Sequence, residues 1–301
     1  MTEAKRVGRD LTQGPVFQSL MIFVFPIILT NLIQQLYSMV DLMVIGRFVG
    51  NVGTVGVSVG GEMADFLTPV ATSFATAGQI LITQLAGARQ TEKLRRSIGS
   101  FLSMNIVLSL VLTVFALVLC RPILTILNCP QEAFSQASSY LIITALGLPF
   151  IFGYNAVCGV LRGMGESKRP LIFIIVAATV NIFLDLLLVI VFRLEAAGTA
   201  IATAASQAAS FAAAFIYMYR HREQFGFEMK LSYFKFDPES LKIIFRLGIP
   251  QACRTILVRV SMMWVNANVN AYGMVASGTN SVGNKLQKFL EIFSQSMSQA
   301  S

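Results

Sequence analysis

Long apolar runs separated by short polar stretches constrain this chain more than any other feature of its sequence. A run of about 18 apolar residues is long enough to cross a bilayer as a helix. Hydrophobic residues make up 55% of the chain and charged residues only 13%, which is about half the charged share of soluble proteins. The sequence therefore predicts an all-α integral membrane protein. The expected spanning helices cover residues 17–45, 56–86, 98–120, 138–161, 171–193, 197–219, 243–271 and 276–301.

The basic residues predict how the chain is oriented in the membrane. A net charge of +8 would suit a nucleic-acid partner, but the basic residues gather in alternate loops rather than in one patch. Only Arg47, Arg121 and Arg193 lie in the opposite set of loops. Because lysine and arginine favour the cytoplasmic side, we expect a cytoplasmic amino terminus in the inner membrane and no nucleic-acid partner. The sixteen basic residues of the cytoplasmic face are Lys5, Arg6, Arg9, Arg89, Lys93, Arg95, Arg96, Arg162, Lys168, Arg169, Arg220, Arg222, Lys230, Lys235, Lys242 and Arg246.

The residues that usually carry out catalysis are scarce in this sequence. The single histidine, His221, lies in a predicted linker, and the four cysteines form no CxxC pair. A membrane enzyme would need a nucleophile with a neighbouring base or a metal cluster. We therefore expect no enzymatic activity and no cofactor.

One stretch near the amino terminus recurs near the end of the chain. The sequence "SVGGEMADFL" begins at Ser58 and "SVGNKLQKFL" begins at Ser281, an offset of 223 residues. Pro26 and Pro250 stand at nearly the same offset, each early in a predicted helix. Six spanning helices separate the first helix from its copy, and because six is even, both units start on the same side of the membrane. This pattern predicts two parallel repeats.

The repeat predicts how the chain is divided. A unit of this length implies a complete protein of roughly 450 residues, so we expect this chain to be truncated at its carboxy-terminal end. The expected parts are an amino-terminal six-helix lobe at residues 1–220, a cytoplasmic linker at 221–242 and two helices of an incomplete second lobe at 243–301.

Two acidic residues stand inside predicted spanning helices. Asp41 lies in the first helix, with Gln34 two turns earlier on the same face, and Asp185 lies in the fifth, with Asn181 one turn earlier. A carboxylate inside a membrane costs several kcal/mol and usually faces a cavity or a partner. Thr203 in the sixth helix adds a hydroxyl group. In a six-helix bundle these groups are expected to share one polar pocket.

Each of these residues also has a purely structural interpretation. Asp41 could be solvated at the outer interface, and Asn181 and Thr203 could join helices by hydrogen bonds. Asp185 has mostly apolar neighbours, which favours a functional role. A carboxyl group in apolar surroundings holds a proton more readily than it does in water, and with amide and hydroxyl oxygens around it can instead hold sodium. We therefore expect a coupling-ion site, for H⁺ or Na⁺, at Asp41 and Asp185.

The helix expected at 243–271 differs from the first one. It carries Arg254 and Arg259 and no acidic residue. These arginines either line an aqueous cleft or, like Lys288 and Glu291 in the next helix, take part only in local charge pairing. The sequence leaves both interpretations open.

Several stretches resemble the multidrug and toxic compound extrusion (MATE) family of transporters. They include "FPIILTNLIQQLYSMVDLMVIGRFVG", "QLAGARQTEKLRRS", "GVLRGMGESKRPLI", "NIFLDLLLVIVF" and "GTAIATAASQ", and together they extend along nearly the whole chain. The resemblance implies a monomer of twelve helices, in two six-helix lobes around a V-shaped cleft, when the protein is complete. It also implies an antiporter that exports small cationic or amphiphilic compounds across the lipid bilayer in exchange for protons or sodium.

The resemblance also implies roles for single residues. In the DinF-like branch of the family, acidic positions of the first lobe match Asp41 and Asp185. The acid that another branch carries in its seventh helix has no counterpart between Pro250 and Ala271, so coupling through the first lobe is the better expectation. The other matches are the polar positions Asn181, Thr203, Gln34 and Asn155 and the proline Pro26, where the first helix can bend.

A second function stays open at this point. A flippase for a lipid-linked substrate, built on a related two-lobe fold, would need a basic cavity for phosphorylated lipid. Arg254 and Arg259 could begin to supply one.

Overall fold

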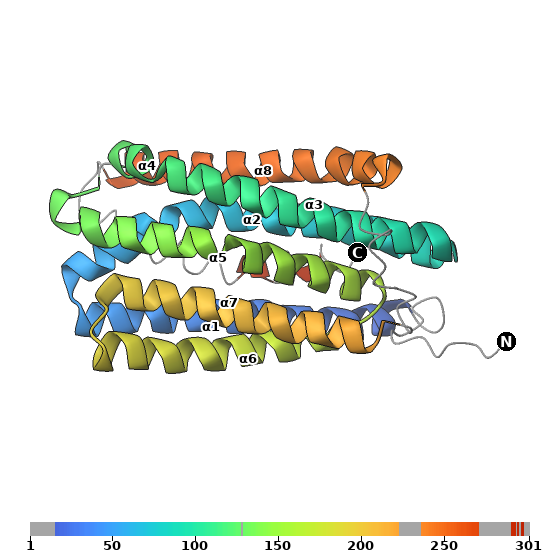
Figure 1. Cartoon of the computed structure of the whole chain (residues 1–301), viewed down its shortest axis with the longest axis horizontal. Coiled ribbons are helices and arrows are strands. Elements are labelled where there is room, and N and C mark those ends of the chain that lie inside the picture. Colours follow the sequence, from blue (N-terminus) through green and yellow to red (C-terminus); the bar gives the residue numbers. More distant parts are fainter. Residues whose placement is uncertain are drawn as a thin grey trace.

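The computed structural model describes residues 16–127, 129–222, 236–270, 290–292, 294, 296 and 297. All regular elements in these residues are helices, and no strand occurs among them. The long helices lie side by side, with α1, α6 and α7 on one side of the bundle and α3 and α8 on the other (Figure 1). The elements are α1 (Val16–Phe48), α2 (Asn51–Gly87), α3 (Thr91–Val118), α4 (Cys120–Ile126), α5 (Gln131–Gly163), α6 (Lys168–Asp185), the π-helix η1 (Leu186–Val191), α7 (Glu195–Arg220) and α8 (Pro238–Asn270).

The six long helices before the linker agree with the predicted membrane spans. Within the described residues, six helical stretches are long and apolar enough to cross a bilayer. The prediction of an all-α membrane fold is confirmed. The six stretches are Leu20–Phe48, Val52–Gly87, Thr91–Val118, Gln131–Gly163, Lys168–Val191 and Glu195–Arg220.

The seventh predicted helix corresponds to α8, with two differences. It begins at Pro238 rather than near residue 243, because Asp237 accepts a hydrogen bond from the backbone N–H of Ser240 at 3.0 Å, and proline is favoured at the first helical position. It is not one of the six stretches above, since its basic residues interrupt the apolar run. Most of the eighth predicted helix, 276–301, lies outside the described residues.

Two local features were not predicted. The short helix α4 follows α3 directly, and Pro122 is tolerated there because it lies in the first turn, where its missing N–H has no helical partner. The predicted helix 171–193 is divided into α6 and the π-helix η1, which begins immediately after Asp185. Short π-helical segments inside α-helices are frequent at functional sites.

Glycines let α2 and α5 approach each other closely. A Cβ atom on Gly60 of α2 would lie 2.7 Å from the carbonyl oxygen of Ala137, and one on Gly159 of α5 would lie 2.9 Å from that of Ala75. Both distances are too short for a side chain, so only glycine fits unless the backbone moves. Small residues at such crossings are typical of packed membrane helices. We call this contact the α2–α5 interface.

The predicted repeat keeps one local feature in both copies. In α2, Ser73 Oγ donates to the carbonyl of Pro69 at 2.7 Å, and Ser296 Oγ donates to the carbonyl of Ile292 at the same distance. Both serines are buried. Ser296 also accepts a hydrogen bond from Asn31 Nδ2 at 3.0 Å, which joins the second copy to α1.

Candidate functional site

The structure places Asp41 of α1 next to Asp185 of α6. Asp41 is 8% exposed and Asp185 is 0% exposed, so neither carboxyl group is solvated at an interface. The two carboxyl groups are close enough to interact with each other; Asn181 lies beside Asp41, and Thr199 of α7 lies beside Asp185. Asn181 and Asp185 share a face of α6 because they are one turn apart. We call Asp41 and Asp185 the acid pair.

Few of the polar atoms around the acid pair have a hydrogen-bond partner. Within the described residues, the buried atoms without one include Asp41 Oδ1, both carboxyl oxygens of Asp185, both amide atoms of Asn181, and the hydroxyl of Thr199. The hydroxyl of Thr203, one turn after Thr199 on the same face of α7, also has none. Buried polar atoms in proteins are nearly always paired, so a group of unpaired ones needs an explanation. A proton or a cation held among them would supply it. We call these five residues the polar cluster.

Apolar side chains close the polar cluster on one side. These side chains form a buried cluster. Its members on α1 and η1 come after Asp41 and Asp185 in the sequence, and its member on α7 comes before Thr199. The cluster therefore lies on the side of the acid pair that is toward the carboxy-terminal end of α1. Tyr140 of α5 packs against it and lies near both acids. The buried members are Val44, Ile45, Val57, Val189 and Ala196.

A hydrogen bond between two helices lies on the other side of the polar cluster. Gln207 of α7 donates from Nε2 to Tyr37 Oη of α1 at 3.3 Å. Tyr37 stands one turn before Asp41, and its hydroxyl is close enough to that acid to be affected by its charge. Neither Tyr37 nor Gln207 was predicted from the sequence. Their spacing from Asp41 and Thr203, four residues in each case, is the signal that could have identified them.

Two of the predicted site residues, Gln34 and Asn155, do not belong to the polar cluster. Asn155 of α5 donates from Nδ2 to the carbonyl of Ile151 in its own helix at 2.8 Å. Gln34 is half-buried on α1, about 10 Å along the helix from Asp41 by the usual rise per residue. Pro26 is buried inside α1, which continues without interruption through it.

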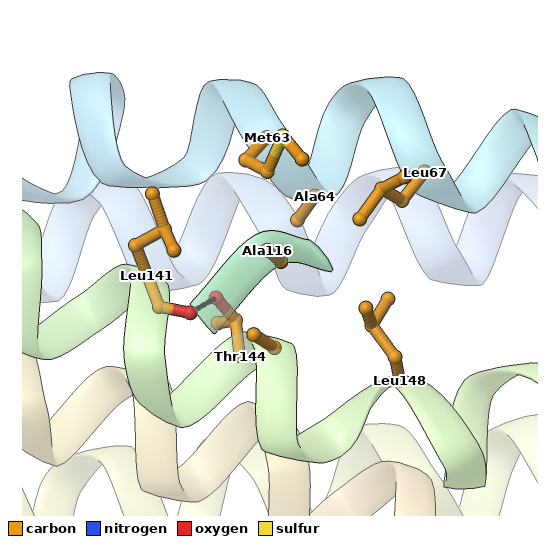
Figure 2. Close-up of a pocket in the computed structure, with 8 residues that line it drawn as sticks. Met63, Ala64, Leu67, Ala116, Leu141, Thr144 and Leu148 are labelled. Carbon is orange, nitrogen blue, oxygen red and sulfur yellow. Dashed lines mark hydrogen bonds between the residues drawn. The ribbon is translucent and has the colours of Figure 1, made fainter. Parts of the chain in front are cut away.

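Two cavities of the described residues lie away from the polar cluster. The first cavity, of about 10 Å³, lies between α2, α3 and α5 and has room for little more than one water molecule (Figure 2). Its lining side chains are Met63, Ala64, Leu67, Ala116, Leu141, Thr144, Ala145 and Leu148. A more open cavity of about 420 Å³ lies at the start of α1 and α6, lined by Met21, Ile22, Val24, Phe25, Pro26, Ile28 and Lys168. Among the described residues no group of three or more His, Cys, Asp or Glu side chains could hold a metal ion.

The fold and the acid pair can now be compared with known proteins. The family model described as MatE matches residues 26–187, just over half of the chain, and includes both acids. The chain belongs to the MATE family. Curated relatives that match the chain are named as multidrug resistance or multidrug export proteins.

Curated MATE relatives are longer than this chain. The probable multidrug resistance protein YoeA of Bacillus subtilis is 30% identical over 291 residues, which are 95% of this chain and 63% of that protein. The multidrug export protein MepA of Staphylococcus haemolyticus is 25% identical over 287 residues, with the same two shares. The chain thus spans 63% of the length of each of these two relatives.

A solved structure shares the fold of the chain. It is described as an outward-facing conformation of a multidrug resistance MATE family transporter of the MOP superfamily. It superimposes with a TM-score of 0.91 at 19% sequence identity, covering 99% of this chain and 66% of that one. At this identity the likeness shows the fold alone.

Proposed function

We propose that this chain acts in secondary antiport, exporting small cationic or amphiphilic compounds in exchange for protons or sodium bound at the acid pair. The observation that carries the proposal is the acid pair itself: two buried carboxyl groups, side by side, among unpaired amide and hydroxyl atoms. Membership of the MATE family and the multidrug names of its curated relatives support export as the task.

The electrostatics of the acid pair suit ion exchange. Two carboxylates a few ångströms apart repel each other, and each also loses solvation when it is buried. A proton shared by the pair, or a sodium ion between them, removes both penalties. The neutral oxygens of Asn181, Thr199 and Thr203 are ligands that sodium accepts and that a proton does not need, so both ions stay candidates.

Antiport requires the acid pair to alternate between an occupied and an empty state. Because the pair contacts α1, α6 and α7 at once, binding of the ion changes the charge at the point where these three helices meet. Substrate is released when the occupied state is favoured, so ion entry drives export. We place this coupling in the amino-terminal lobe, as in the DinF-like branch, with a cytoplasmic amino terminus in the inner membrane of a monomer.

The test uses everted membrane vesicles from cells that express the gene encoding this chain. Transport of a fluorescent dye that is an efflux substrate is followed under an imposed proton gradient and, separately, under a sodium gradient. The gradient that drives dye transport in the wild type identifies the ion, and Asp185→Asn should abolish that transport at normal expression. The matched control is Glu132→Gln, which changes an exposed acid at the start of α5. Transport by Asp185→Asn equal to wild type under both gradients would refute the proposal.

A flippase for a lipid-linked substrate is the second candidate, and one observation favours it. Arg254 and Arg259 are both exposed on α8, where they are available to a phosphorylated head group. Replacing both with glutamine separates the two functions. Drug antiport predicts that dye efflux survives this change, whereas a flippase predicts no dye efflux in the wild type and loss of lipid translocation in the variant.

A further inference from the structure

The larger of the two cavities lies at the level where two membrane spans begin. It has a volume of about 420 Å³ and lies at the start of α1 and α6, whose spans begin at Leu20 and Lys168. The two helices are neighbours on one side of the bundle (Figure 1). Because a span begins where the bilayer meets water, one end of this cavity lies at the depth of the lipid head groups. Its volume is in the usual range of ligand pockets, about 300–1,000 Å³. We call it the α1–α6 groove.

The walls of the α1–α6 groove are apolar except at one end. Its apolar side chains all come from α1, and among them Ile22 is 38% exposed and Phe25 is 65% exposed. Among the described lining residues the one charged side chain is Lys168, the first residue of α6. An apolar groove with a single cation at the membrane surface fits an amphiphile that has an acyl chain and a negatively charged head group.

The charge of Lys168 is available to such a ligand. Its neighbour Arg169 stacks over the ring of Tyr217 in α7, 4.9 Å from the ring centroid. Lys168 is exposed, and within the described residues its ammonium group makes no ion pair or hydrogen bond. The nearest acid in the sequence is Glu166, and its Oε1 accepts hydrogen bonds from the backbone N–H groups of Lys168 and Arg169 at 3.1 and 3.4 Å. Glu166 therefore caps the start of α6 and does not line the groove.

We propose that the α1–α6 groove binds one phospholipid with a negatively charged head group, with an acyl chain along α1 and the head group at Lys168. An exposed lysine at a membrane surface attracts anionic lipids only weakly, but an apolar groove beside it holds the chain of one lipid in place. Since α1 and α6 carry Asp41 and Asp185 toward their other ends, the bound lipid joins the two helices that form the acid pair. This inference goes beyond the proposed function and does not depend on it.

The test is native mass spectrometry of the purified chain in detergent. The probes are phosphatidylglycerol, which is negatively charged, and phosphatidylcholine with the same acyl chains, which has no net charge. Wild type should bind one phosphatidylglycerol about fivefold more tightly than phosphatidylcholine, because one lysine at a membrane surface contributes about that factor. Lys168→Gln should reduce this preference to less than about twofold. The matched control is Lys242→Gln, which changes an exposed lysine near the start of α8 and should leave the preference unchanged.

A second pair of variants tests the apolar part of the groove. Ile22→Trp fills part of the groove and should weaken phosphatidylglycerol binding by roughly tenfold. Ile172→Trp is its control, because Ile172 is 47% exposed on α6 and does not line the groove. Both positions are exposed, so both variants should stay folded and monodisperse.

Three results would overturn the inference. The first is equal binding of the two lipids by wild type, and the second is an unchanged preference in Lys168→Gln. The third is equal weakening by Ile22→Trp and Ile172→Trp, which would mean that the lipid does not occupy the groove. Soluble glycerol phosphate should not displace the bound lipid, and displacement by it would equally contradict a lipid site.

Discussion

The α2–α5 interface and the contact between α1, α6 and α7 are built on opposite principles. In the α2–α5 interface, glycines bring two backbones so close that an added Cβ on Gly60 would lie 2.7 Å from a carbonyl oxygen. Where α1, α6 and α7 meet, by contrast, buried polar atoms lie without hydrogen-bond partners, including both carboxyl oxygens of Asp185. The helices of the first contact are closely packed and have little room to move. The second contact contains polar atoms without hydrogen-bond partners, which an ion can bind.

This difference assigns different tasks to the two contacts. A closely packed interface stabilises one arrangement of its helices, because any shift opens voids or creates clashes. A group of buried, unpaired polar atoms costs stability and is kept where it serves a function. We therefore regard α2 and α5 as the scaffold of the amino-terminal lobe, and α1, α6 and α7 as its ion-responsive part.

The largest expected effect is loss of the scaffold. Gly60→Leu should abolish the yield of folded protein, and Gly60→Ala should lower the free energy of unfolding by about 1–3 kcal/mol, because the new Cβ meets the backbone of α5. The measurement is the thermal unfolding midpoint in detergent, with the yield of monodisperse protein. Gly61→Ala is the control, since a Cβ there has its nearest neighbour at 3.6 Å. Equal effects of the two alanine variants would remove the distinction between the two contacts.

The ion-responsive part should behave in the opposite way when its charge is removed. Asp41→Asn and Asp185→Asn should each leave stability unchanged or raise it by about 1–3 kcal/mol, because a buried charge without a partner is relieved. The same variants should lose ion-coupled transport. Thermal unfolding at neutral pH, without added sodium, provides the measurement. A large loss of stability in both variants would mean that the acids serve the fold.

A pair of threonines compares the ion-responsive part with a structural hydrogen bond to α5 by one chemical change. Thr199→Val should weaken sodium binding by roughly tenfold with little effect on stability, because the hydroxyl is a sodium ligand that has no hydrogen-bond partner to lose. Thr113→Val should do the reverse: its hydroxyl joins α3 to α5 through the carbonyl of Ala145 at 3.1 Å, so its loss costs about 1 kcal/mol but leaves ion binding intact. Sodium and proton titrations measure ion binding, and thermal unfolding measures stability. The expected result is that Thr199→Val changes only ion binding and Thr113→Val changes only stability.

The sequence predicted the spanning helices well because their apolar runs are long and the polar residues within them are few. It also singled out Asp41, Asp185, Asn181 and Thr203 as candidates, since each is conspicuous in an apolar helix, and their role as a site stays a prediction. Whether such residues meet depends on which helices are neighbours, and helical periodicity alone does not specify this. The structure brings α1, α6 and α7 together around the acid pair.

Other features were beyond the reach of the sequence for identifiable reasons. The π-helix after Asp185 changes the helical geometry without a glycine or proline to mark it. Tyr37 and Gln207 are ordinary residues in membrane helices until their hydrogen bond shows that they meet. Asn155 was expected only from the resemblance to the MATE family, and such a match does not show that its amide donates within its own helix, to the carbonyl of Ile151.

The smallest expected effect concerns Asn155. Asn155→Leu should change ion binding by less than about twofold, since its amide already donates to its own helix. Asn181→Leu, the matched change in the polar cluster, should weaken sodium binding by roughly tenfold or more, because its amide oxygen lies beside the acid pair without a hydrogen-bond partner. Competition between sodium and protons, measured by calorimetry, compares the two. Equal weakening would extend the site to α5.

The most direct test of the central claim is a count of the cations that the purified chain binds, protons and sodium together, in wild type and in Asp185→Asn. Proton uptake is measured in weakly buffered solution and sodium uptake with a radioactive tracer, on the same samples across one pH series. If the acid pair holds the coupling ion, wild type binds one more cation per chain than the variant at neutral pH, where an ordinary solvated aspartate carries neither a proton nor a bound sodium ion. Equal counts at neutral pH, with the variant folded, would contradict the claim that this pair is an ion site.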